Sequence, residues 1–80
     1  MNTYNIYQHD LLEHLLTAKD AESMNTILQD LLTPSELSEI SKRLQIIRLL
    51  EKGMPQRQIA ETLGVGIATV TRGSRALKDK

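Results

Sequence analysis

The sequence has no cysteine, no tryptophan and no phenylalanine, and its only aromatic residues are Tyr4 and Tyr7. Without cysteine, neither a disulfide nor a thiolate metal site can hold the fold together. The core must therefore be built from Leu, Ile, Val, Ala and Met. Eighty residues form one domain at most and bury a modest core. We therefore expect a single domain, residues 1–80, that gains further burial as a homodimer.

Long apolar runs are also missing from the sequence. No stretch approaches the length of a membrane span. Residues 1–10 are polar and lack the basic and then apolar order of a secretory signal. From this pattern we expect a cytoplasmic protein with no membrane partner.

Each half of the chain is poor in charge of one sign, although the formal net charge is zero. Residues 1–40 contain one lysine and seven acidic residues, whereas residues 41–80 contain nine Lys or Arg and three acidic residues. A basic C-terminal half suits a polyanion such as nucleic acid. Pairing between acidic and basic helices explains the same split, so charge alone leaves both interpretations open.

Apolar residues recur at helical spacing along the chain, and no alternating strand pattern or hairpin turn interrupts them. A first helix is expected over residues 6–18. A second is expected over residues 21–31, where Asp20 can cap the first turn. The fold class is therefore all-α, with five short helices.

The sequence Thr33-Pro34-Ser35-Glu36 is typical of a helix start. The threonine can accept a hydrogen bond from a first-turn amide, proline suits the first helical position, and the glutamate completes a capping box. This third helix is expected to extend to about Lys52, with Gly53 as its C-terminal cap. Its end is apolar on several sides, which predicts burial from more than one direction.

Residues 56–72 have the residue types of a helix-turn-helix. Ala60 is small enough for two helices to cross steeply, and Gly64 tolerates the positive φ of the tight turn between them. The helices are expected at about residues 56–63 and 66–78. The apolar positions of the motif are Ile59, Leu63, Val65 and Val70. The side chains of the last helix expected to face the core are Val70, Gly73 and Leu77. An ordinary helical hairpin is the alternative.

The other face of the last helix is suited to DNA. Small and hydroxylic side chains, Ala68 and Thr71, allow close approach to base edges. Gln56 and Arg57 begin the preceding helix, where backbone amides favour a phosphate. The basic residues expected to meet phosphate or guanine are Arg72, Arg75, Lys78 and Lys80. For Arg72 and Arg75, a solvated basic face is the alternative.

Four stretches of the chain resemble the tryptophan operon repressor family. They are Thr33-Pro34, Arg43, Gln56-Arg57 and the run Gly66-Ile67-Ala68-Thr69-Val70-Thr71-Arg72-Gly73-Ser74. The similarity is strong from about Leu32 to Lys78. It implies an intertwined homodimer that represses transcription by binding a double-stranded DNA operator. It also implies L-tryptophan as corepressor, and no other cofactor is expected. The expected parts are dimerisation helices in residues 1–32, a central helix in residues 33–53 and the helix-turn-helix in residues 54–80.

The resemblance also implies roles for individual residues. The family's two arginines that sandwich the indole ring match Arg43 and Arg72, and a planar guanidinium both stacks on an aromatic face and holds a carboxylate. Thr33 matches a residue that lies at the ligand's carboxylate. Backbone carbonyls of the partner subunit, at the positions that match Asp30 and Leu32, would accept from the ligand's ammonium group. Further pocket-lining positions are Thr69 and Gly73. The positions that match DNA contacts are Gln56, Arg57, Ile67, Ala68 and Thr71.

Several positions depart from the family pattern. Ala76 stands where the family has a serine that helps hold the ammonium group, and Asp30 replaces an apolar residue. Ala60 replaces a lysine that touches DNA. The sequence ends at Lys80, before the family's last helix, which implies a truncated chain or a smaller dimer interface. The alternative is therefore a DNA-binding regulator of this fold with no amino-acid ligand. A helical interaction module that never touches DNA is a third hypothesis.

No catalytic or metal site is expected, so the sequence predicts a protein that is not an enzyme. His9 and His14 are five residues apart, a spacing that does not place both imidazoles on one helical face. The serines have no base or orienting group that would make a catalytic nucleophile.

Overall fold

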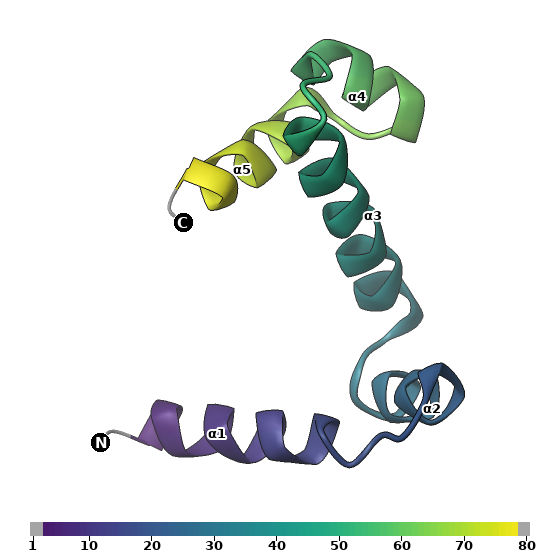
Figure 1. Cartoon of the computed structure of the whole chain (residues 1–80), viewed down its shortest axis with the longest axis vertical. Coiled ribbons are helices and arrows are strands. Elements are labelled where there is room, and N and C mark those ends of the chain that lie inside the picture. Colours follow the sequence, from purple (N-terminus) through teal and green to yellow (C-terminus); the bar gives the residue numbers. More distant parts are fainter. Residues whose placement is uncertain (1–2, 79–80) are drawn as a thin grey trace. The chain divides into compact units, whose positions relative to one another are not determined.

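The computed structural model describes residues 3–78, with the side chains of Thr3, Tyr4, Ala76 and Lys78 left outside that description. Five helices follow one another, and the described residues contain no strand, so the all-α expectation is confirmed (Figure 1). The helices are α1 (Thr3–Leu15), α2 (Ala21–Leu31), α3 (Pro34–Glu51), α4 (Gln56–Leu63) and α5 (Ile67–Lys78). None of them, within residues 3–78, is long and apolar enough to cross a membrane.

Helix α1 begins and ends three residues earlier than the sequence predicted. The reason for its early end lies in residues 14–18. The amide of Thr17 donates to the carbonyl of His14 (3.1 Å) and that of Ala18 to Leu15 (3.2 Å), so the last turn tightens. The Thr17 hydroxyl also donates to the His14 carbonyl, at 2.7 Å. A threonine bonded to its own backbone in this way competes with continuation of the helix.

The chain divides into two compact units, residues Met1–Leu37 and Ser38–Lys80. The first contains α1, α2 and the first turn of α3. No described residue of this unit is fully buried. Instead, leucines surround an apolar cavity of about 430 Å³, whose lining residues are Leu11, Leu15, Leu28, Leu31 and Leu32. Leu16 is 81% exposed. This unit therefore leaves several large apolar side chains exposed.

The second unit has a small closed core. Ile46 from α3, Ile59 from α4 and Val70 from α5 are each 0% exposed, so the three helices share one buried centre. Gly73 brings α5 close to α3, because a Cβ added there would lie 2.6 Å from Cγ2 of Ile46. Val70 and Gly73 thus face the core, as the sequence predicted. Partly buried apolar side chains surround this centre: Leu49, Leu50, Met54, Ala60, Leu63 and Val65.

Two glycines end helices in the left-handed conformation, as expected. Gly53 has φ 89° and follows α3. The amide of Gly53 donates to Leu50 (3.0 Å) and that of Met54 to Leu49 (3.1 Å), which is the Schellman pattern. Gly64, with φ 68°, caps α4, and the amide of Val65 donates to the Ala60 carbonyl at 3.0 Å. Both glycines therefore set the directions in which the following helices leave.

Capping boxes begin α2 and α3, and both starts agree with the sequence prediction. Asp20 accepts from the backbone amide of Ser23 at 2.8 Å. Thr33 Oγ1 accepts from the Glu36 amide at 3.1 Å, and a Glu36 carboxylate oxygen accepts from the Thr33 amide at 2.8 Å. These reciprocal bonds satisfy amides that the helix itself leaves unpaired.

Both caps will weaken in acid. The pKa of Asp20 is lowered mainly by the hydrogen bond from the Ser23 amide, and the pKa of Glu36 by that from the Thr33 amide. A lowered pKa in the folded state means that the stabilisation is present above the ordinary values, 3.8 and 4.5, and is lost as the pH falls through the folded-state values. An NMR titration of the two carboxyls should give midpoints below the ordinary values.

The control for this titration is Glu36→Gln, which preserves a capping acceptor but cannot titrate. It should leave the Asp20 midpoint unchanged and remove the second transition. Midpoints at or above the ordinary values would contradict the prediction.

Candidate nucleic-acid interface and ligand cavity

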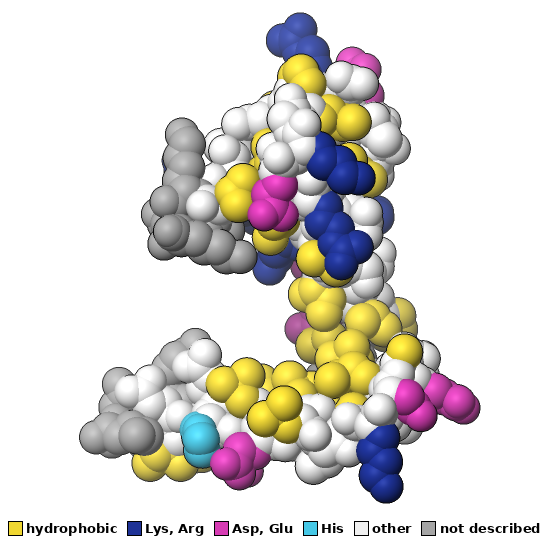
Figure 2. Space-filling view, in the orientation of Figure 1, with side chains coloured by type: hydrophobic (Ala, Val, Ile, Leu, Met, Phe, Trp, Pro, Cys, Tyr) yellow, Lys and Arg dark blue, Asp and Glu magenta, His cyan; other side chains and the backbone are white. Residues whose placement is uncertain are grey.

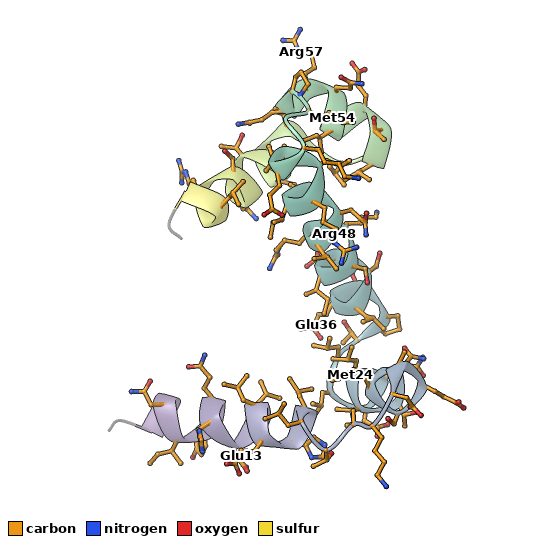
Figure 3. The ribbon with its side chains drawn as sticks, in the orientation of Figure 1. Glu13, Met24, Glu36, Arg48, Met54 and Arg57 are labelled. Carbon is orange, nitrogen blue, oxygen red and sulfur yellow. The ribbon has the colours of Figure 1, made fainter. Side chains whose placement is uncertain are left out.

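Helices α4 and α5 are joined by three residues, 64–66, and pack against one another. Pro55 precedes α4 in an extended conformation and its carbonyl accepts from the Ile59 amide at 3.0 Å. No side chain caps the start of α4. Arg57 is exposed there and extends away from the helices, as Figure 3 shows. The start of α4 therefore offers backbone amides and a guanidinium to the outside.

The faces of α5 differ sharply. Val70 and Gly73 are buried against α3 and α4. Ile67 at the start of α5 is 51% exposed. The other exposed residues of this helix are Ala68, Thr69, Arg72 and Arg75. Lys78 was also expected to contact DNA, but its side chain lies outside the described residues. Ala68, Arg72 and Arg75, which the sequence assigned to DNA, are therefore on the outward face of α5, and their contacts with DNA stay a prediction.

Thr71 differs from the other residues of α5 that the sequence assigned to DNA, because its side chain is half-buried. Its hydroxyl lies 3.1 Å from Oε1 of Gln56 and 3.0 Å from the carbonyl oxygen of Ile67. The first contact joins the middle of α5 to the start of α4. Sequence reasoning missed this link, because residues fifteen positions apart share no periodic pattern. Two of the expected DNA-contacting side chains therefore also hold α4 and α5 in register.

A cavity of about 280 Å³ lies within the second unit, between α3 and the start of α5. Its lining residues are Glu39, Lys42, Arg43, Val65, Gly66, Thr69 and Arg72. The volume lies just below the usual range for small-molecule pockets, roughly 300–1,000 Å³. Arg43, Thr69 and Arg72 were predicted to line a ligand pocket, and the structure brings all three together. Glu39 and Lys42 were not anticipated.

The charged side chains of this cavity carry no partner of their own. Within residues 3–78, Arg43 and Arg72 make neither an ion pair nor a side-chain hydrogen bond, and the same holds for Glu39 and Lys42. Three cations and one carboxylate, all exposed, therefore line one small volume without a partner among the described residues. A ligand that carries an anionic group could use it.

Four of the residues that the sequence assigned to the ligand are not among those that line the cavity. Gly73 packs against Ile46 instead. Asp30, Leu32 and Thr33 belong to the first unit, where Asp30 is exposed and Leu32 lines the leucine cavity. Thr33 Oγ1 accepts from the Glu36 amide, which leaves its hydroxyl proton available to donate. Their expected ligand roles stay predictions.

Comparison with known proteins identifies the chain. Residues 8–80 match the family described as Trp repressor protein. The chain is 46% identical over 72 residues to the Trp operon repressor homolog of Vibrio vulnificus, a match that covers 89% of this chain and 68% of the relative. It is 44% identical over 71 residues to the homolog of Pasteurella multocida, covering 88% and 70%. The protein is therefore a transcriptional regulator and not an enzyme. It belongs to the Trp repressor family.

Proposed function

We propose that this protein is a DNA-binding repressor that acts in the cytoplasm as a homodimer and uses L-tryptophan as corepressor. The observation that carries the proposal is the position of Arg72. This residue lies on the exposed face of α5 and also lines the cavity between α5 and α3. One side chain can therefore connect a bound ligand with a DNA-binding helix.

The proposed DNA surface combines α4 and α5 as a helix-turn-helix. The start of α5, with Ile67 and Ala68, would enter the major groove, where small and apolar side chains meet base edges and the thymine methyl. Figure 2 shows Lys and Arg side chains gathered over the unit that contains these helices. The proposed phosphate or base contacts are Gln56, Arg57, Thr71, Arg72, Arg75 and Lys78.

The proposed ligand mode follows from the two arginines of the cavity. Arg43 extends from α3 and Arg72 from α5, so a flat ring between their guanidinium planes would touch both helices. The ligand's carboxylate would bind a guanidinium, with Thr33 as a further donor. A ligand placed there would favour one angle of α5 relative to α3. It would thereby raise DNA affinity to the extent that it binds that arrangement better.

The proposed dimer explains the apolar surface of the first unit. Leucines that no part of the described chain covers would be buried by a second copy, which supplies the core that this unit lacks. Figure 2 shows this yellow surface along α1 and α2. The large apolar side chains that this unit leaves exposed are Ile6, Tyr7, Leu11, Leu12, Leu16 and Leu31. In this arrangement residues 1–80 form one domain, with 1–32 for dimerisation, 33–53 as the central helix and 54–80 for DNA.

The test is a band-shift titration of the whole chain on duplexes selected from a random pool, at two salt concentrations, with L-tryptophan or L-leucine. L-Tryptophan should tighten binding by about 5–150-fold, the usual range of allosteric coupling, and L-leucine should not. Affinity should fall steeply with salt, because phosphate contacts release counterions. Size-exclusion chromatography of the same sample should show a dimer.

Two other results would each support a different function. Identical shifts with and without L-tryptophan would indicate a DNA-binding regulator without an amino-acid ligand. No salt-sensitive binding to any duplex would indicate a helical interaction module and would end the DNA proposal.

A further inference from the structure

The ligand cavity contains a carboxylate that the proposed function does not yet use. Glu39 lines it together with Lys42, Arg43 and Arg72. Glu39, Arg43 and the buried Ile46 follow one another at helical spacing, so they share a face of α3. That face meets α5, because Ile46 is the residue against which Gly73 packs. The position of Glu39 at the cavity is therefore fixed by the same packing that forms the core.

A simpler explanation for Glu39 would be an ion pair along its own helix. A glutamate four residues before an arginine is the favourable order for such a pair, and Arg43 occupies that position. Lys42, three residues on, is the other possible partner. Glu39 makes neither ion pair in the structure. Its carboxylate thus has no donor from the described residues, in a cavity whose other charged side chains are Lys42, Arg43 and Arg72.

We propose that Glu39 is a specificity-determining residue that receives the ammonium group of the ligand, so that the cavity selects an α-amino acid over the matching acid without an amine. The proposal rests on the proposed function. Three cations alone would favour any compact carboxylic acid, with or without an amine. A carboxylate beside them repels a second negative charge and accepts from an ammonium, which has three donors. The cavity therefore carries side chains of both charges, which match the two charges of a zwitterionic ligand.

This acceptor is distinct from Asp30, which belongs to the other unit of the chain.

The experiment compares L-tryptophan with indole-3-propionic acid, which differs from it only in lacking the amine. Both are titrated calorimetrically into the whole protein, into Glu39→Gln and into the control Glu61→Gln. Glu61 is an exposed glutamate of α4 that does not line the cavity, so its variant has the same change of net charge. Glu39→Gln should weaken L-tryptophan about tenfold, or about 1.4 kcal/mol, and leave indole-3-propionic acid unchanged or tighter. Glu61→Gln should change neither.

A second measurement does not depend on any variant. The side-chain carboxyl ¹³C resonance of Glu39 in the unaltered protein should shift with L-tryptophan and not with indole-3-propionic acid. If L-tryptophan binds but the ratio of the two affinities is the same in Glu39→Gln, the role of Glu39 is refuted and the proposed function stands. If neither compound binds the unaltered protein, the ligand part of the proposed function fails and this inference fails with it.

Discussion

Gly73→Ala will destabilise the protein by about 1–3 kcal/mol, the usual cost of one extra methyl group in a closed core. The added Cβ would lie 2.6 Å from Cγ2 of Ile46 and 3.8 Å from a methyl of Leu50. Ile46 cannot move aside cheaply, because it is fully buried and its branch at Cβ restricts χ1. Helix propensity alone predicts the opposite sign, since alanine is favoured over glycine by about 1 kcal/mol in a helix. The sign of the change therefore tests the packing of α5 on α3.

The measurement is thermal unfolding followed by circular dichroism, at one protein concentration because the proposed dimer would make the midpoint depend on it. For a chain of this size, each kcal/mol corresponds to a shift of about 4–8 °C. Gly66→Ala is the matched control, because nothing lies within 4 Å of a Cβ there. A second substitution, Ile46→Leu, in the Gly73→Ala protein removes the Cγ2 methyl that the new Cβ would meet. It should restore part of the lost stability. A Gly73→Ala protein as stable as the original would contradict the packing described here.

The elements that the sequence predicted well are those with a local cause. Both capping boxes and both left-handed glycines depend on residues within one turn of each other, so the bounds of α2 and α4 could be predicted from the sequence. The end of α1 could not be predicted in this way. The apolar spacing predicts a helix that continues through Thr17, whereas the Thr17 hydroxyl bonds to the carbonyl three positions back. The choice between those two conformations is a matter of small energy differences that periodicity does not measure.

The candidate site was predictable only in part, for a different reason. Arg43, Thr69 and Arg72 could be named from a resemblance, which carries residue types from one chain to another. Glu39 and Lys42 line the same cavity because of the way α3 and α5 pack, and no short motif contains that information. Gly73 shows the same limit. The resemblance assigned it to a pocket and helical spacing assigned it to the core, and the structure places it against Ile46.

Arg72→Ala will abolish L-tryptophan binding at working concentrations, with a loss of about a hundredfold or more. The same change will weaken DNA binding even without ligand. The first loss follows because one side chain supplies both a stacking plane and a charged donor in the proposed site. The second follows because Arg72 is exposed on α5, where a cation would meet phosphate.

Two further arginines separate these effects. Arg43 lines the cavity from α3, so Arg43→Ala should lose L-tryptophan binding and retain ligand-free affinity for DNA. Arg75 is exposed on α5 and does not line the cavity, so Arg75→Ala should keep L-tryptophan binding, weaken DNA and reduce the salt slope by about 1. Calorimetry and salt-dependent band shifts on the three variants measure both properties. Only Arg72→Ala should lose both, because only that side chain belongs to both surfaces. If Arg72→Ala instead behaved like Arg75→Ala, Arg72 would have no part in binding the corepressor, and it could not connect the cavity with the DNA-binding helix.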